Sequence, residues 1–249
     1  MTRVLNLDLD FFLRDAAHWR GRQHERLDAN ECPPWLLEEA ISFLEDRCGL
    51  AGKLPGFVVE HHGELFDRWR SAIDGGRLNV PFHLTHVDAH ADLGLGDAGY
   101  VYLMTKLLFG APKNRRYPDP DELADGNWLA FAIACRWVSA MVYVFNDGGG
   151  DDLFPYHMQN FDVTADNIEL KAIRPEDWKA VEYKVDKRSA VIAHREPLVP
   201  IQQMRWDSFA TDQPFDVICL AQSPPFTPPE ADVIFDEIKR HYVDETAFA

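Results

Sequence analysis

Paired cysteines, long apolar runs and an excess of basic residues are all missing from this sequence. The four cysteines are scattered without a CxxC pair, which favours reduced thiols in a cytoplasmic protein over a disulfide framework. No uninterrupted apolar run approaches the roughly 18 residues of a membrane helix, and no signal peptide is visible before the first apolar segment. We therefore expect a cytoplasmic protein without a membrane partner.

Charge of one sign dominates the chain. There are 41 Asp and Glu residues against 25 Lys and Arg residues, which gives a formal net charge of -16. A nucleic-acid-binding protein needs a basic surface, so we exclude nucleic acid as a partner. The acidic excess instead suits metal ions or a cationic substrate, although much of it serves as solubilising surface.

Apolar segments of strand length alternate with segments of helical periodicity along the 249 residues. This alternation predicts an α/β fold of three layers, α/β/α, around a mostly parallel sheet, with residues 1–249 forming a single domain. The expected strands are 4–12, 57–59, 81–87, 140–145, 168–173, 180–185, 190–194 and 215–221. The expected helices are 35–48, 65–73, 128–139 and 229–242, and residues 14–27 are expected to form a loop and an exposed helix.

Two rows of metal-capable side chains stand at predicted strand ends. In the first row Asp88, His90 and Asp92 occupy every second position, and in the second row Asp8 and Asp10 do the same. Alternate side chains of a strand share a face, so each row should project to one side. In open parallel sheets ligands bind beyond the carboxyl ends of the strands, where both rows are expected.

Together with a histidine after the strand 57–59, these rows provide four carboxylates and two imidazoles. One Asp-x-Asp pair in a strand is common and often structural, but burying so many carboxylates without a cation is very costly. Six such groups exceed the needs of one zinc ion and suit two divalent cations, because oxygen-rich ligation favours manganese over zinc. Two ions about 3.5–4 Å apart can bridge a water and hold it as hydroxide.

These segments resemble the arginase, or ureohydrolase, superfamily, whose fold is related to that of the histone deacetylases. Residues 88–92, DAHAD, resemble its DAHxD signature, and residues 8–10, DLD, resemble its DxD signature. Residues 58–64, VVEHHGE, resemble the first-histidine segment of a branch that includes peptide arginases, and residues 126–129 and 223–229 are also similar to that branch. The resemblance implies an arginase/deacetylase-like fold and conversion of peptidyl arginine to ornithine, with release of urea.

The resemblance also implies a site with two Mn²⁺ ions and a bridging hydroxide. One ion would be held by His62, Asp88, Asp92 and Asp8, and the other by Asp88, His90, Asp8 and Asp10. Asp92 and Asp10 would be the catalytic acids, with Asp92 relaying the proton of the hydroxide to the departing amine. Among the other histidines, we expect His61 to lie behind the ligands or at the surface, and His86 to be a ligand partner or a core residue.

The sequence departs from the superfamily pattern in three places. The DxD strand stands at the N-terminus instead of following DAHxD. Arginases carry a catalytic histidine shortly after a Gly-Asn pair, whereas here Asn127 is followed by Trp128 and Leu129. Arginases also end a late strand with a glutamate that pairs with the guanidinium, whereas here this strand ends in Gln222. We therefore assign substrate binding to the candidates Asn127, Gln222, Glu60 and Glu64.

Several functions remain open on these residues. The first is a manganese-dependent hydrolase of guanidino groups acting on an arginine-containing precursor peptide. The second is a ureohydrolase of a small guanidino compound such as agmatine, and the third is a metal-dependent amide hydrolase of the deacetylase type. A fourth reading is a non-catalytic binding protein that keeps the metal for stability, which the missing histidine and glutamate favour.

Overall fold

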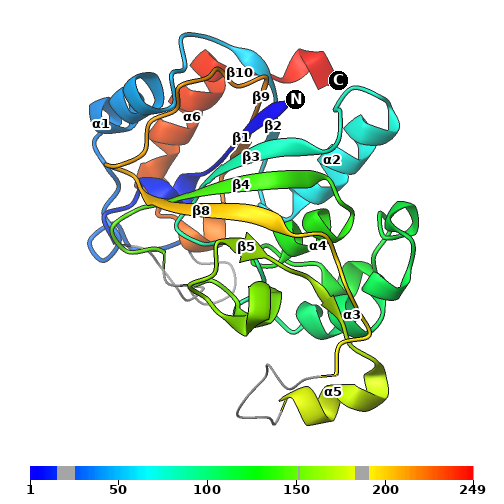
Figure 1. The fold of residues 1–249 in the computed structure, drawn as a ribbon. Coiled ribbons are helices and arrows are strands. Elements are labelled where there is room, and N and C mark those ends of the chain that lie inside the picture. Colours follow the sequence, from blue (N-terminus) through cyan, green and yellow to red (C-terminus); the bar gives the residue numbers. More distant parts are fainter. Residues whose placement is uncertain (16–25, 151, 183–190, 249) are drawn as a thin grey trace.

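A computed structural model describes residues 1–15, 26–150, 152–182 and 191–248, and its centre is one large β-sheet (Figure 1). The sheet has eight strands in the order β10-β2-β9-β1-β3-β4-β8-β5. Their bounds are β1 Arg3–Asp8, β2 Leu54–Val59, β3 Phe82–Val87, β4 Val138–Phe145, β5 Asn167–Ile168, β8 Val199–Arg205, β9 Val217–Ala221 and β10 Val243–Asp244. A separate two-stranded pair joins β6 Lys171–Ala172 to β7 His194–Arg195.

The N-terminal strand lies in the middle of this sheet. Asn6 of β1 is in register with His86 of β3 on one side and with Cys219 of β9 on the other, and both pairings are parallel. Every other pairing in the large sheet is parallel except that of β5 with β8. The sequence prediction of an α/β fold with a mostly parallel sheet is therefore confirmed.

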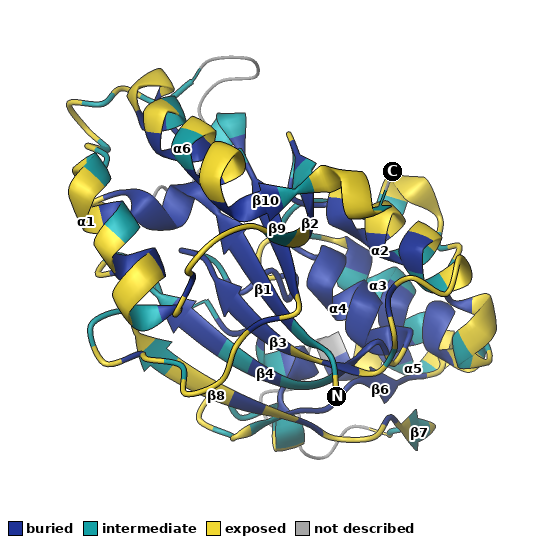
Figure 2. Ribbon diagram, turned by 90° about the horizontal axis from the view of Figure 1, so that it is seen from above, coloured by how far each residue is buried: buried dark blue, intermediate teal, exposed yellow. Residues whose placement is uncertain are grey.

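Helices cover both faces of the sheet, as the view from above shows (Figure 2). Helices α1 and α6 lie on one face, and α2, α3 and α4 lie on the other. The bounds are α1 Leu37–Ser42, α2 Glu64–Asp74, α3 Gly99–Thr105, α4 Trp128–Ala134, α5 Pro175–Glu182 and α6 Asp232–Tyr242. Each face has its own buried apolar cluster, one around Trp69 and Trp128 and the other around Phe11 and Phe43.

The strand predicted over 4–12 is shorter in the structure. It ends at Asp8, and Leu9–Phe12 form a 3-10 turn that Asp8 caps by accepting a hydrogen bond from the backbone N–H of Asp10. Asp10 therefore does not share a strand face with Asp8. In the same way β3 ends at Val87, so that residues 88–92 form a loop and not a continued strand. The prediction that each row shares one face of a strand was therefore wrong.

Other boundaries also differ from the sequence prediction. The helix expected over 128–139 ends at Ala134, because Arg136 adopts a left-handed conformation with φ 61 and the chain then enters β4. The strand expected over 180–185 is wrong where it is described, since residues 180–182 end α5. The helix expected over 35–48 begins at Leu37 and continues as a π-helix over Phe43–Arg47.

The strand β8 was not predicted, because its exposed Pro200, Gln202 and Gln203 break the apolar pattern. Residues 168–173 form two short strands, β5 and β6, with a break between them, and the segment 190–194 contributes only His194 to β7. Most of the predicted loop and helix 14–27 lies outside the described residues, as does Ala190.

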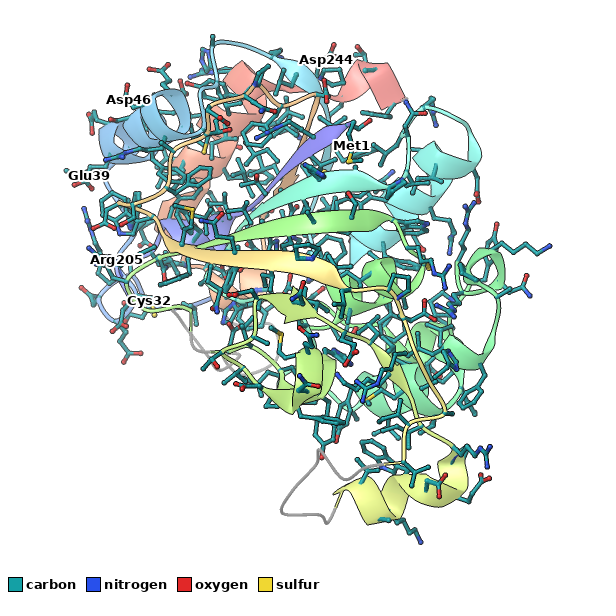
Figure 3. The ribbon with its side chains drawn as sticks, in the orientation of Figure 1. Met1, Cys32, Glu39, Asp46, Arg205 and Asp244 are labelled. Carbon is teal, nitrogen blue, oxygen red and sulfur yellow. The ribbon has the colours of Figure 1, made fainter. Side chains whose placement is uncertain are left out.

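Acidic side chains of the α1 region lie on the outside of the molecule. Figure 3 shows Glu39 and Asp46 at its edge, and both residues are exposed. This part of the negative charge is therefore solvated surface, as the sequence analysis expected of much of the excess. Among the described residues, none of the helices has the length and apolar character needed to cross a membrane.

Candidate metal centre

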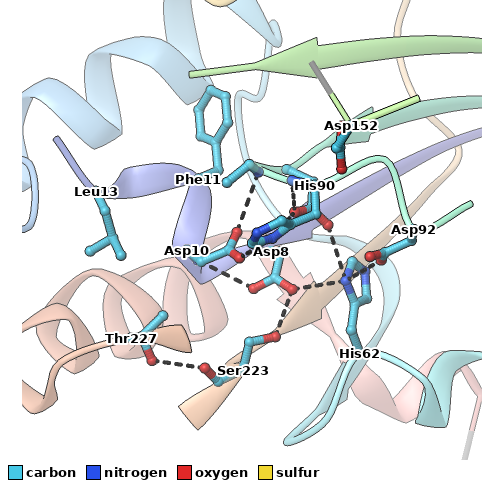
Figure 4. Close-up of polar contacts among 12 residues, drawn as sticks. Asp8, Asp10, Phe11, Leu13, His62, His90, Asp92, Asp152, Ser223 and Thr227 are labelled. Carbon is cyan, nitrogen blue, oxygen red and sulfur yellow. Dashed lines mark hydrogen bonds and ion pairs between the residues drawn. The ribbon is translucent and has the colours of Figure 1, made fainter. Parts of the chain in front are cut away.

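The two acidic rows and the histidine after β2 meet at the carboxyl edge of the sheet. Asp8 ends β1, Asp88 follows β3 directly, and His62 follows β2 by three residues. Because β1 lies between β3 and β9, and β2 is the next strand beyond β9, these three chain segments end close together. Figure 4 shows Asp8, Asp10, His62, His90 and Asp92 pointing toward one another. All six residues predicted as metal ligands are brought into this cluster.

The first half of the cluster surrounds one ring nitrogen of His62. Nδ1 of His62 lies 2.8 Å from Asp8 Oδ2, 2.9 Å from Asp92 Oδ2 and 3.1 Å from Asp88 Oδ2. The three carboxylates come from three separate chain segments. Their convergence on one nitrogen matches the ligand set that the resemblance implied for one of the two ions.

The second half of the cluster is built around His90. Nδ1 of His90 lies 2.9 Å from Asp10 Oδ2 and 3.8 Å from Asp88 Oδ1. Asp88 thus presents one oxygen to His62 and the other to His90. A carboxylate placed between two imidazoles in this way has the geometry of a bridging ligand.

A layer of neutral polar groups supports the cluster from behind. Asn6 Nδ2 lies 2.8 Å from His62 Nε2 and 2.8 Å from His86 Nδ1, and all three side chains are buried. Ser223, in a left-handed conformation after β9, donates its hydroxyl to Asp8 Oδ2 at 2.6 Å. Such contacts fix the orientation of metal ligands. Neither Asn6 nor Ser223 was identified from the sequence as a partner of the ligands, since a single asparagine or serine carries no specific signal.

His86 belongs to this supporting layer. It is fully buried, its Nε2 lies 3.0 Å from the backbone oxygen of His90, and the same nitrogen lies 3.4 Å from Asp88 Oδ2. The sequence alone is compatible with His86 as a ligand partner or as a core histidine, and the structure shows both features. His61, by contrast, is half-buried at the rim and its Nδ1 lies 3.7 Å from Asp125.

The loop that carries Asp92 is held in place by two more distant residues. Asp152 accepts a hydrogen bond from the backbone N–H of Ala91 at 2.6 Å and one from the hydroxyl of Tyr143 at 3.2 Å. Nδ1 of His157 lies 2.7 Å from the backbone oxygen of Leu93. The sequence offered no signal for either contact, because both partners are far from the loop along the chain.

Burial and mutual repulsion strongly perturb the carboxyl groups of the cluster. Burial, followed by the charges of Asp10, Asp92 and Asp8, raises the pKa of Asp88 well above its usual value. Burial also raises the pKa of Asp92 to about 6. Both shifts reflect the energetic cost of burying several carboxylates close together, away from water. A bound divalent cation would remove this cost.

The pKa values of the two imidazoles are raised as well, but here the cause is the nearby negative charge. Burial alone would lower the pKa of His90, but the Asp10 carboxylate outweighs it and raises this pKa to about 11. The same balance, with Asp8 and Asp92 as the nearby charges, raises the pKa of His62 well above normal. Without a cation, protonated imidazoles supply the positive charge that the carboxylates require.

The donor set fits a divalent cation in two places. Two groups of buried or half-buried residues each bring one ligand atom per residue within 4.8 Å of the others, namely His62, His86 and Asp88, and Asp10, Asp88 and His90. Asp88 Oδ2 is buried and accepts no hydrogen bond from the residues that the structure describes. Four carboxylates with two imidazoles favour a hard or borderline ion over a soft one.

A cavity of about 720 Å³ opens directly onto this cluster. Besides the cluster, it is lined by Leu93, Leu95, Gly96, Asp97, Ala124, Asp125, Gly126, Asp152, Ser223 and Phe226. The volume is within the range of small-molecule sites. Asp97 and Asp125 were not identified as site residues from the sequence, because acidic residues are so frequent in this chain.

The four residues assigned to substrate binding lie elsewhere among the described residues, outside the cavity lining. Asn127 folds back on its own loop, where it accepts a hydrogen bond from the Ala124 N–H and donates one to the Glu122 backbone oxygen. Gln222 donates to Asp232 at 3.0 Å. The remaining two candidates, Glu60 and Glu64, are exposed.

Comparison with known proteins adds no further assignment. No family model matches the chain, and no curated protein is significantly similar to it.

Proposed function

We propose that this protein is a manganese-dependent hydrolase of guanidino groups that converts peptidyl arginine to ornithine and releases urea. The observation that carries the proposal is the shared position of Asp88, which lies between two imidazoles that each face further carboxylates. This arrangement provides adjacent places for two cations at the carboxyl edge of a parallel sheet. In this proposal the fold is arginase-like, with the DxD strand relocated to the N-terminus of the chain.

Each ion would be held by one imidazole and by carboxylates of the cluster. His62, Asp8, Asp88 and Asp92 would hold one Mn²⁺, and His90, Asp10, Asp8 and Asp88 would hold the other. Two bound Mn²⁺ ions would lower the pKa of a water molecule and so supply a nucleophile near neutral pH.

The proton balance of the reaction points to Asp92. Hydrolysis of a guanidinium adds water to the central carbon and breaks one carbon–nitrogen bond, so one proton must reach the departing amine. The Asp92 carboxyl group lines the cavity, and its Oδ2 lies 2.9 Å from Nδ1 of His62, beside the proposed position of one ion. From that position it would take a proton from the attacking water and pass it to the departing amine.

The cavity supports a cationic substrate with an extended body. Asp97 and Asp125 present carboxylates along its wall, and the apolar Leu95 and Phe226 stand beside them. Leu95 is 52% exposed, which leaves an apolar side chain available at the mouth. A guanidinium with a peptide attached matches this combination of negative and apolar lining.

Asp125→Asn tests the charge of this wall. We expect KM for an arginine-containing peptide to rise about 10-fold or more, since a hydrogen bond to a charged group contributes about 1.5–3 kcal/mol. The backbone contact should survive, because the asparagine oxygen can still accept the Gly63 N–H that Asp125 Oδ1 accepts at 3.0 Å. The control is Asp67→Asn, at an exposed site on α2, and steady-state kinetics would compare the two variants. Equal KM values for Asp125→Asn and Asp67→Asn would contradict the placement of the substrate cation.

The direct test of the function is urea release by the manganese-loaded protein. An arginine-containing peptide, agmatine and free arginine are compared at equal concentrations. We expect the peptide to have the highest kcat/KM. A preference for agmatine would favour a small-molecule ureohydrolase. No urea from any of the three substrates, with manganese bound, would overturn the proposal and favour the amide hydrolase or the binding protein.

A further inference from the structure

Trp128, the first residue of α4, makes an unusual contact with the candidate metal centre. Its side chain is fully buried, and its indole Nε1 donates a hydrogen bond to Asp92 Oδ2 at 2.7 Å. The same oxygen lies 2.9 Å from His62 Nδ1. A buried indole N–H needs an acceptor, and here the acceptor is one of the candidate metal ligands.

The indole ring also separates the cluster from the apolar core. Its centroid lies 5.0 Å from that of His62 on one side and 4.9 Å from that of Trp69 on the other. Trp128 therefore contacts both an imidazole and a carboxylate of the same half of the cluster. A shift of this ring would displace His62 and Asp92 together.

Asp92 requires such support because of its backbone. It adopts a left-handed conformation with φ 51, in a loop and not in a strand, so the sheet does not fix its side chain. Nearby carboxylates would repel its oxygens in the absence of a cation. A neutral N–H donor can fix one oxygen without adding charge, which makes it suited to orienting a ligand.

We propose that Trp128 is a positioning residue, which orients Asp92 for the cation held at His62. It lies in the segment after Asn127 where the sequence resemblance led us to expect a catalytic histidine. An indole N–H is only a hydrogen-bond donor and does not ionise near neutral pH, so the residue holds the carboxylate in place and does not relay protons. The inference depends on the part of the proposed function that places a divalent cation in the centre, but not on the reaction.

The test is the affinity of the whole protein for Mn²⁺ after Trp128→Phe, measured by isothermal titration calorimetry. Phenylalanine keeps an aromatic ring and removes the N–H. We expect the dissociation constant of the ion at His62 to rise about 10- to 100-fold, as for other contacts that orient metal ligands. The matched control is Trp137→Phe, at a fully buried indole just before β4 that packs against Phe66, and it should bind Mn²⁺ as the unmodified protein does.

A double-mutant comparison shows whether Trp128 acts through Asp92. In an Asp92→Ala background, Trp128→Phe should change the Mn²⁺ dissociation constant by less than about twofold, because its partner is already gone. Equal Mn²⁺ affinity in Trp128→Phe and Trp137→Phe would overturn the inference. A full effect of Trp128→Phe in the Asp92→Ala background would also overturn it.

A measurement without any variant covers the case in which Trp128→Phe does not fold. In the indole ¹⁵N–H spectrum of the unmodified protein, Mg²⁺ or Zn²⁺ should shift the signal of the indole that is hydrogen-bonded to Asp92. If no indole signal shifts with the ion bound, the inference fails. If manganese binds and the Trp128 effects appear but no urea forms, the proposed reaction fails and the positioning role of Trp128 stands.

Discussion

Replacing Asp88 with alanine should remove bound manganese and urea formation together. Asp88 is the carboxylate that faces both His62 and His90, so its loss takes a ligand from both ions at once. The expected loss of activity is about 1000-fold, because the ions supply several kcal/mol of transition-state stabilisation and each 1.4 kcal/mol is a factor of ten. Metal content by elemental analysis and urea release, measured on the same sample, would show the two losses.

The stability of the metal-free Asp88→Ala variant distinguishes this result from simple unfolding. Burial, followed by the nearby carboxylates, raises the pKa of Asp88, so alanine removes a group whose charged form is disfavoured in the cluster. Against this gain stand the loss of the hydrogen bond from the His90 backbone N–H to Asp88 Oδ1 at 2.8 Å and the loss of the contacts of Asp88 with the two imidazoles. We expect the metal-free variant to unfold within about 1 kcal/mol of the metal-free parent.

The matched control is Asp67→Ala, at a carboxylate that is 69% exposed on α2 and pairs only with Arg70 among the described residues. It removes the same charge from the chain and should keep both the metal and the activity. If Asp88→Ala retained its full manganese content, the assignment of Asp88 as the shared ligand would be wrong.

Sequence reasoning located the cluster, although its local argument was wrong. Asp88, His90 and Asp92 lie in a loop, and Asp10 lies in a 3-10 turn, so a shared strand face does not bring them together. They converge because β1 lies beside β3 in a parallel sheet. The rule that ligands gather at the carboxyl ends of parallel strands therefore predicted more than the alternation of side chains did.

Contacts between distant segments could not be predicted in the same way. The indole of Trp128 reaches Asp92 across 36 positions, and the Ser223 hydroxyl reaches Asp8 across 215 positions. A single sequence gives residue types and local periodicity, but it does not show which buried donor meets which acceptor. The same limit explains why Asn127 and Gln222, which looked free to bind substrate, have partners inside the protein.

His157 should make the protein lose stability as the pH falls below about 6.5. The ring is fully buried, and burial, assisted by the charge of Lys171, lowers its pKa to about 3 although a contact with the Leu93 backbone oxygen opposes the shift. In the unfolded chain the pKa of a histidine is about 6.5. Between these two values the unfolded state binds one proton more than the native state.

The sign of the effect follows from that difference in bound protons. The stability contributed by neutral His157 is complete above pH 6.5 and is lost as the pH falls toward 3. One proton corresponds to about 1.4 kcal/mol per pH unit. Lowering the pH from 6.5 to 5 should therefore cost about 2 kcal/mol of unfolding free energy through this residue alone.

His157→Gln isolates this contribution, because glutamine does not titrate and its amide N–H can still donate to the Leu93 backbone oxygen. Guanidinium unfolding of the metal-free proteins between pH 7.5 and 5 should show a shallower loss of stability in the variant. The difference in slope should approach one proton, since the carboxylates of the cluster titrate in both proteins and cancel. The matched control is His241→Gln, at an exposed histidine on α6, which should reproduce the parent slope. If the free energy of unfolding fell equally steeply with pH in His157→Gln and in the parent, His157 would be protonated in the native state. The prediction that this buried ring is neutral would then be wrong.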